Sequence, residues 1–337
     1  MTRRTAPGVS APLLMFVLGL PAPAPAAEPA PGPVTRGTFR FDPAGDDKAD
    51  VPDRYRMPAR DFDFALTPRF EMPHAGVSVL NLTFPSPVKS DVPANDTVHA
   101  EYFVPKAASA AAKVPGVVVL DIMDGAGTVA RGQAVWLAQH GTAALYVHMA
   151  HYGPRRPPGS PVRMMSTNLE QTFAAVRQTV LDCRAAAAWL GSRPEVNADK
   201  LGLIGTSLGS LIGANVAAAE PRLKNVCLLL PAGGLVDAFY DHPKARPYTA
   251  VADLLGGREG LKRLIAPADP ITYAPQLRQR NLLMIAASRD DVLPPSAARA
   301  LWEASGKQRI MWVDSTHVGA AAYALPALKA VSEHVAR

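Results

Sequence analysis

The residues best suited to chemistry lie in Gly205-Thr206-Ser207-Leu208-Gly209, which has the form G-x-S-x-G. The apolar run 201–204 precedes this stretch, and an Ala- and Gly-rich helical pattern over 208–219 follows it. A Ser on such a strand-to-helix turn presents its hydroxyl, and the flanking glycines leave room for the neighbouring strand and helix. The helix directs its first N–H groups toward charge that forms near the Ser oxygen. The pattern indicates a nucleophilic Ser207.

A Ser hydroxyl becomes a nucleophile when a base removes its proton, and an acid must orient that base. Where a Ser on such a turn works in a triad, the chain order is Ser, acid, His. Three histidines follow Ser207, namely His242, His317 and His334. His334 lies in the last helical pattern and His242 in a segment that interrupts the strand–helix alternation. His317 follows the apolar run 309–313 at a strand's carboxyl end, which favours it as the base.

The acid should lie in the loop after the preceding strand, 288–295, which contains Asp290 and Asp291. Only one of two adjacent carboxylates can point at His317. We favour Asp290 and keep Asp291 as the alternative. The other carboxylate is expected to cap a helix or to face solvent.

An oxyanion hole needs two N–H donors. One is the N–H of Leu208, directly after the nucleophile. The second should come from the loop after the apolar run 117–120, where we favour Ile122 and keep Met123 as the alternative. We expect no metal and no other cofactor, because His148 and His151 are three residues apart and would face opposite sides of a strand.

The elements that position these residues alternate between apolar strands and helical patterns from residue 114 onward. This alternation predicts an α/β fold with a mainly parallel central sheet flanked by helices. Short strand-like pieces at 37–41, 62–66, 77–84 and 97–104 predict an antiparallel or mixed opening region. Residues 232–275 break the alternation and are expected to form a small cap insertion over the pocket.

The N-terminus has the features of a secretory signal. Arg3 and Arg4 precede an apolar run, Ala11–Leu20, that is too short to span a bilayer, and Ala24-Pro25-Ala26 offers a cleavage site. We expect a signal peptide over 1–27, a Pro- and Ala-rich linker over 28–36 and one domain over 37–337. A secreted or periplasmic protein with no stable membrane insertion after cleavage follows from this interpretation.

Charge and cysteine content bear on the possible binding partners and on disulfide formation. The net charge is +6 in 337 residues, but no Lys/Arg run with interleaved aromatic residues occurs, so we expect no nucleic-acid partner. Arg155 and Arg156 are expected to brace a loop, with the binding of an anionic substrate group as the alternative. Cys183 and Cys227 are expected to be buried free thiols, although an oxidising compartment would allow them to pair.

These stretches together resemble the α/β-hydrolase superfamily over about 97–335. Within it, the chain is similar to the branch of dienelactone hydrolases and acetyl xylan esterases, and the matching pieces are 152–159, 188–190, 205–209, 269–271 and 290–295. The resemblance implies catalytic Ser207, Asp290 and His317, an oxyanion donor at Ile122 and action on ester bonds. The chain departs from it in two ways, with Ser instead of the dienelactone hydrolases' Cys nucleophile and Asp121-Ile122 where many esterases have His-Gly.

The function that follows is a secreted serine hydrolase that cleaves carboxylic ester bonds through an acyl-enzyme. Its substrate is expected to be a small-molecule or carbohydrate ester. Two alternatives stay open, a serine peptidase of the same fold and a non-catalytic binding protein of the hydrolase fold.

Overall fold

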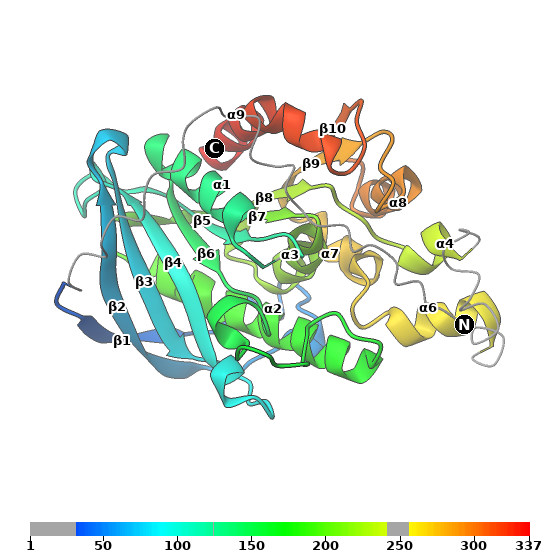
Figure 1. Ribbon diagram of the computed structural model, residues 1–337, viewed down its shortest axis with the longest axis horizontal. Coiled ribbons are helices and arrows are strands. Elements are labelled where there is room, and N and C mark those ends of the chain that lie inside the picture. The colour runs from blue at the N-terminus through cyan, green and yellow to red at the C-terminus, as the bar shows by residue number, and fades with distance from the viewer. Residues whose placement is uncertain (1–31, 124, 241–255) are drawn as a thin grey trace, which may run out of the picture. The chain divides into compact units, whose positions relative to one another are not determined.

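Ten strands form one sheet in the computed structural model, which describes residues 32–123, 125–240 and 256–337 (Figure 1). They lie in the order β1-β2-β3-β4-β6-β5-β7-β8-β9-β10. The strands are β1 (Thr35–Phe41), β2 (Arg60–Met72), β3 (Val77–Pro85), β4 (Thr97–Pro105), β5 (Val114–Leu120), β6 (Ala143–Val147), β7 (Val196–Thr206), β8 (Leu223–Leu229), β9 (Asn281–Ala287) and β10 (Arg309–Val313). The pairings from β1 to β6 are antiparallel and those from β6 to β10 are parallel, as expected for the two parts of the chain.

Helices cover both faces of this sheet (Figure 1). On β5, Val117 and Val119 pack with α1 and α9, whereas Val118 packs on the other face with α2 and α3. Such a strand, apolar on both faces, is typical of a buried parallel sheet. The α-helices are α1 (Thr128–Gln139), α2 (Leu169–Gly191), α3 (Leu208–Ala219), α4 (Leu235–Phe239), α6 (Gly257–Ile265), α7 (Ala274–Leu277), α8 (Pro295–Ala304) and α9 (Ala324–Val335). Short 3-10 helices are η1 (Asp53–Tyr55), η2 (Pro73–Ala75), η3 (Pro93–Asp96), η4 (Gly153–Arg155), η6 (Pro270–Tyr273) and η7 (Gly319–Tyr323).

The segment expected to form a cap contributes α4, α6, η6 and the start of α7. The Asp269 carboxylate accepts hydrogen bonds from the N–H groups of Gly234, Leu235 and Ile271 at 2.9, 2.8 and 3.1 Å. One buried side chain therefore joins the two ends of the insertion. Residues 241–255, which include His242, lie outside the described residues.

The N-terminal boundary is described only in part. The expected signal peptide over 1–27 and the first residues of the expected linker lie outside the described residues. Strand β1 begins at Thr35, two residues before the expected domain boundary, because Thr35 and Arg36 pair with Leu66 and Ala65 of β2.

Both cysteines are buried and free, as favoured from the sequence. Cys183 lies in α2 and Cys227 in β8. Burial away from water raises the pKa of each thiol well above its ordinary value. These thiols are therefore poor nucleophiles in the folded protein.

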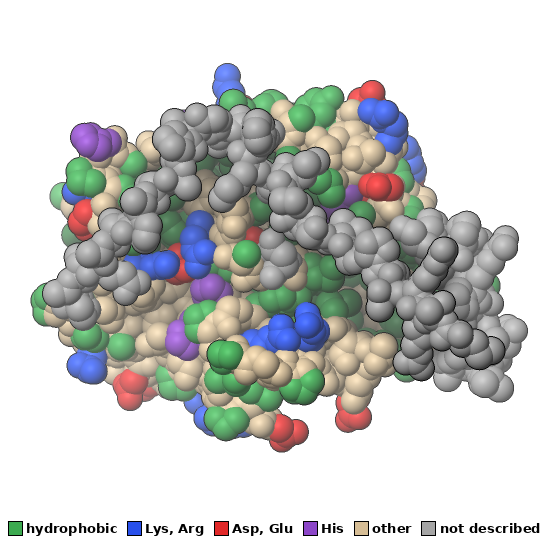
Figure 2. Space-filling view, viewed as in Figure 1, with side chains coloured by type: hydrophobic (Ala, Val, Ile, Leu, Met, Phe, Trp, Pro, Cys, Tyr) green, Lys and Arg blue, Asp and Glu red, His purple; other side chains and the backbone are tan. Residues whose placement is uncertain are grey.

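Two observations on the described residues concern insertion into a membrane and the distribution of basic charge on the surface. In the described part of the chain, no helix is both long and apolar enough to cross a membrane. Figure 2 shows Lys and Arg side chains interspersed with Asp and Glu, so the described residues visible on this face form no continuous basic patch.

Candidate active site

Ser207 lies at the turn between β7 and α3 and has a positive φ. Its φ and ψ are 53° and −116°, a conformation that costs an L-residue about 1–3 kcal/mol. The Ser207 N–H donates to the Leu229 carbonyl at 2.9 Å, and the Ser210 hydroxyl donates to the Ser207 carbonyl at 2.7 Å. These hydrogen bonds hold the strained turn in place.

The two glycines of the motif allow close backbone contacts. A Cβ on Gly205 would collide with the carbonyl oxygen of Gly209. A Cβ on Gly209 would lie 2.5 Å from the carbonyl oxygens of Leu120 and Asp121. The first turn of α3 therefore lies directly against the loop that follows β5.

Ser207, Asp290 and His317 follow β7, β9 and β10, and their side chains form a chain of hydrogen bonds. The Ser207 Oγ lies 2.9 Å from His317 Nε2, and His317 Nδ1 lies 2.7 Å from Asp290 Oδ2. The side chains of His317 and Asp290 are only 12% and 4% exposed. The structure thus brings together the three side chains that the sequence singled out.

The two adjacent aspartates of the acid loop have different partners. Asp290 Oδ1 accepts hydrogen bonds from the N–H groups of Val292 and Leu293 at 2.9 and 2.7 Å, which leaves Oδ2 facing the imidazole. Asp291 instead accepts the backbone N–H of His317 at 3.2 Å. Burial raises the pKa of Asp290, but the hydrogen bonds from His317, Leu293 and Val292 outweigh it and hold that pKa below its ordinary value. Asp290 is thus the ionised partner of the imidazole.

The expected oxyanion donors lie on either side of the Gly209 contact. Leu208 is the first residue of α3, where no intrahelical carbonyl accepts its N–H. Ile122 follows Asp121 directly in the loop whose carbonyl oxygens touch Gly209. Both residues therefore lie next to the Ser207 turn, and the roles assigned to them stay predictions.

The loop that contains Ile122 is fastened to the start of α1. The Asp121 carboxylate accepts hydrogen bonds from the N–H groups of Gly127 at 2.7 Å and Ala130 at 3.1 Å. Farther along α1, Gln133 Nε2 donates to Thr206 Oγ1 at 2.9 Å, next to the nucleophile. Helix α1 is therefore tied to the loop after β5 and to the turn after β7.

A second set of contacts to this loop comes from β4, in the antiparallel part of the sheet. Glu101 of β4 accepts hydrogen bonds from Arg131 Nε and Nη2 at 2.8 and 2.6 Å, and forms an ion pair with Arg69 at 2.7 Å. Arg131 Nη1 also donates to the carbonyl of Ala126 at 2.8 Å. Sequence reasoning missed this cluster, because no local pattern connects Glu101 with residues about 30 positions away.

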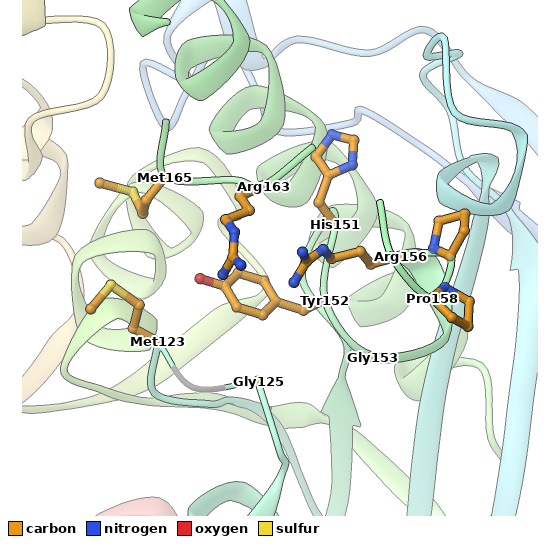
Figure 3. Close-up of a pocket in the computed structure, with 11 residues that line it drawn as sticks. Met123, Gly125, His151, Tyr152, Gly153, Arg156, Pro158, Arg163 and Met165 are labelled. Carbon is orange, nitrogen blue, oxygen red and sulfur yellow. The ribbon is translucent and has the colours of Figure 1, made fainter. Parts of the chain in front are cut away.

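A pocket of about 540 Å³ opens beside the Ile122 loop (Figure 3). Met123, the other oxyanion candidate, lines it together with Tyr152, Arg156, Arg163 and Met165. In Figure 3 the two methionine side chains lie at one end of the view, and the side chains of Arg156 and Arg163 extend toward Tyr152. Ser207, Asp290 and His317 do not line this pocket, whereas Met123, the residue that follows Ile122 in the sequence, does.

The two adjacent arginines have different surroundings. Arg155 is fully buried, lies 2.7 Å from Asp182 and donates to the Asn95 carbonyl at 2.7 Å, so it braces the loop as expected. Arg156 donates to the Ser160 carbonyl at 2.6 Å and also lines the pocket.

The two histidines considered as a metal pair have separate partners. His148 Nδ1 lies 3.2 Å from the Tyr146 hydroxyl, whereas His151 Nε2 lies 3.5 Å from Asn95 Nδ2. Among the residues that the structure describes, no group of three His, Cys, Asp or Glu side chains is arranged to hold a metal ion.

Comparison with known proteins identifies structures of the same fold. An acetyl xylan esterase from Paenibacillus sp. R4 has a TM-score of 0.64 and 17% identity, over 80% of this chain and 88% of that one. Acetyl xylan esterase 1 from Thermoanaerobacterium sp. JW/SL YS485 has a TM-score of 0.57 and 19% identity, over 80% of this chain and 87% of that one. The predicted α/β-hydrolase fold is confirmed.

Sequence comparison assigns the family. Two uncharacterized proteins of Mycobacterium tuberculosis are each 28% identical over 143 residues, which is 42% of this chain and 33% of theirs. The match therefore spans about a third of the length of these relatives. The model of the dienelactone hydrolase family matches residues 100–309. The predicted branch is confirmed, and the chain belongs to the dienelactone hydrolase family.

Proposed function

We propose that this protein is a serine hydrolase that cleaves carboxylic ester bonds through an acyl-enzyme. The observation that carries the proposal is the hydrogen-bonded chain from Ser207 Oγ through the His317 ring to Asp290. Membership in a family named for the hydrolysis of a cyclic ester supports it.

The proposed reaction begins with neutral His317, whose Nδ1–H donates to Asp290. His317 Nε2 accepts the Ser207 proton while Ser207 Oγ forms a bond to the ester carbonyl carbon. The N–H groups of Leu208 and Ile122 stabilise the negative charge on the carbonyl oxygen. His317 then gives its proton to the departing alcohol oxygen as the carbon–oxygen bond breaks.

The second half of the reaction releases the acid. His317 accepts a proton from water, and the resulting hydroxide oxygen attacks the acyl-enzyme. Ser207 leaves with the proton that His317 returns, and the carboxylic acid departs. Asp290 stabilises the charged imidazole in both halves.

We further propose small-molecule or carbohydrate esters as substrates, and export guided by residues 1–27. The structural neighbours called acetyl xylan esterases support the first point as an analogy of fold. Edman sequencing of the protein recovered from the periplasm and the medium tests the second. A mature N-terminus near residue 28 is expected, and a protein confined to the cytoplasm with an intact N-terminus contradicts it.

The decisive experiment compares the wild type with Ser207→Ala on p-nitrophenyl acetate. We expect kcat to fall by at least about 10³-fold with an unchanged thermal unfolding temperature. A fluorophosphonate probe should label the wild type at Ser207 and leave the variant unlabelled. Turnover that survives the substitution contradicts the nucleophile, and an unreactive wild type favours a binding protein instead.

A further inference from the structure

The pocket that contains Arg156 and Arg163 has an unbalanced charge. Its lining includes these two guanidinium groups, and none of its described lining residues is Asp or Glu. Figure 3 shows the side chains of both arginines extending toward Tyr152, so two positive charges face the same space. Like charges that share a pocket repel each other, and an anion between them replaces this repulsion with attraction.

Neither arginine is neutralised by a carboxylate among the described residues. Arg156 donates through Nε and Nη2 to the Ser160 carbonyl at 3.2 and 2.6 Å. Arg163 forms no ion pair and no side-chain hydrogen bond in the described part of the chain. Arg155, in contrast, lies 2.7 Å from the buried carboxylate of Asp182. The two charges in the pocket therefore lack the kind of partner that the adjacent arginine has.

Internal contacts fix the walls of the pocket. Arg155 donates to the carbonyls of His148 and Asn95 at 3.1 and 2.7 Å and so anchors the loop that begins at Tyr152. The Tyr152 ring packs against Gly125, where a Cβ would collide with it. A pocket whose walls are already held in place loses little conformational entropy when a ligand binds.

The rest of the lining suits an apolar group attached to the anion. Met123 and Met165 are 58% and 47% exposed, and both line the pocket together with Tyr152. Thioether and aromatic side chains form favourable contacts with an aromatic ring. A cavity of about 150 Å³ is enough for a benzene ring. The pocket of about 540 Å³ therefore has room for such a ring and an oxyanion group.

We propose that this pocket binds a small organic acid, whose carboxylate or phosphate group accepts hydrogen bonds from Arg156 and Arg163 and whose apolar part lies against Tyr152 and the two methionines. The planar guanidinium fork matches the oxygens of either group. This binding site is separate from the proposed hydrolysis, because the three proposed reacting side chains do not line it.

Isothermal titration calorimetry of the full-length protein tests the site with benzoate, phenyl phosphate, inorganic phosphate and benzyl alcohol. The better of the two aromatic anions should bind with a Kd of about 1 mM or below, and its identity distinguishes a carboxylate ligand from a phosphate. Inorganic phosphate and neutral benzyl alcohol should each bind at least about fivefold more weakly. Ser207→Ala should bind the better anion as the wild type does, so the result does not depend on hydrolysis.

Arg163→Gln should weaken binding of the better anion by about fivefold to tenfold and leave the thermal unfolding temperature unchanged. Arg163→Lys keeps the charge without the planar fork and should lose less affinity. The matched control is Arg36→Gln, because Arg36 is an exposed arginine of β1 at the edge of the sheet. It removes the same net charge and should leave the Kd unchanged at 0.15 M salt.

A second measurement locates the anion in this pocket. His151 lines the pocket, and burial together with the charges of Arg155 and Arg156 lowers the pKa of its ring. An anion beside Arg156 offsets that charge, so a saturating concentration of the better anion should raise the pKa of His151 in an NMR titration. An unchanged pKa contradicts binding at this place.

Asp124, between Met123 and Gly125 in the sequence, lies outside the described residues. Binding that appears only in Asp124→Asn would show that the chain's own carboxylate neutralises the arginines, and would overturn the proposal. The same follows if neither aromatic anion binds, if benzyl alcohol or inorganic phosphate binds equally well, or if Arg163→Gln keeps the wild-type affinity. Loss of binding in Ser207→Ala would place the anion at Ser207 instead.

Discussion

The parallel and antiparallel parts of the sheet differ in the residues that follow their strands. Loops after β5, β7, β9 and β10 hold Ile122, Ser207, Asp290 and His317, so every residue of the proposed machinery follows a parallel strand. Strands β1–β4 contribute none of these residues. Parallel strands end at one edge of a sheet, and the loops there meet even when they are distant in sequence.

The antiparallel part contributes support instead of chemistry. Its main link to the site is Glu101, which holds Arg131 and, through it, the carbonyl of Ala126. The contrast suggests that substitutions in the parallel part mainly lower activity, whereas those in the antiparallel part mainly lower stability.

Asp290→Asn should lower kcat by about 10⁴-fold, with only a small loss of stability at pH 7 from removal of a carboxylate whose pKa is lowered in the folded protein. An asparagine keeps the size of the side chain but no longer holds His317 in the tautomer that accepts the Ser207 proton. Steady-state kinetics and thermal unfolding measure the two quantities.

The matched control is Asp291→Asn, in the adjacent residue that accepts the backbone N–H of His317. We expect kcat to fall by less than about tenfold, because the neutral amide oxygen still accepts this bond. Equal losses in the two variants would contradict the assignment of Asp290.

Asp121→Asn should lower kcat by about tenfold and change KM little. The amide offers one acceptor where the carboxylate accepts two N–H groups, from Gly127 and Ala130, so the neighbouring Ile122 N–H loses its fixed position. Complete loss of such a donor costs about 10²–10³-fold, and displacement should cost less.

A transition-state analogue separates this effect from a general loss of structure. An alkyl boronic acid should bind Asp121→Asn about tenfold more weakly, in parallel with kcat. Asp199→Asn, at an exposed position of β7, should change neither value. A kcat equal to that of the wild type would show that Asp121 does not position the donor.

Glu101→Gln should change kcat by less than about threefold but lower the free energy of unfolding by about 2 kcal/mol at pH 7. Burial raises the pKa of Glu101, but His148, whose Nε2 lies 3.6 Å away, and the hydrogen-bonded Arg131 outweigh it and lower the pKa to about 2. A carboxylate with a lowered folded pKa stabilises the protein above its unfolded pKa of about 4.3 and loses this contribution as pH falls toward 2.

Urea unfolding at several pH values measures this dependence. The wild type should lose more stability than Glu101→Gln between pH 5 and pH 2, so the difference between them should shrink as pH falls. A large loss of kcat at pH 7 with unchanged stability would break the division between the two parts of the sheet.

Elements with strong local patterns were predictable from the sequence. Helix α3 and strand β10 have the predicted bounds, because an apolar period marks their residues. Strand β7 instead begins at Val196, five residues earlier than expected, because the polar residues Asn197, Asp199 and Lys200 separate Val196 from the apolar run that begins at Leu201. Strand β2 continues through Pro68, where the register with β3 shifts and accommodates the missing N–H.

Contacts between distant segments account for what the sequence did not predict. Ser207, Asp290 and His317 each follow a parallel strand. Because the carboxyl ends of parallel strands meet at one edge of a sheet, the sequence was sufficient to predict that these residues lie together. The pocket was predictable only in part, because Tyr152 and Arg156 lie in a stretch that the sequence singled out, whereas Arg163 and Met165 lie in a loop without period or motif. Glu101 and Arg131 likewise meet only once β4 and α1 have packed.

The contact of Gly209 with Leu120 and Asp121 bears on how this protein could be engineered. The two proposed donors belong to one rigid backbone unit, so a side chain at Gly209 would separate them and disable hydrolysis of every ester at once. A directed-evolution library for new substrates should therefore keep both glycines of the turn fixed and randomise positions outside this contact.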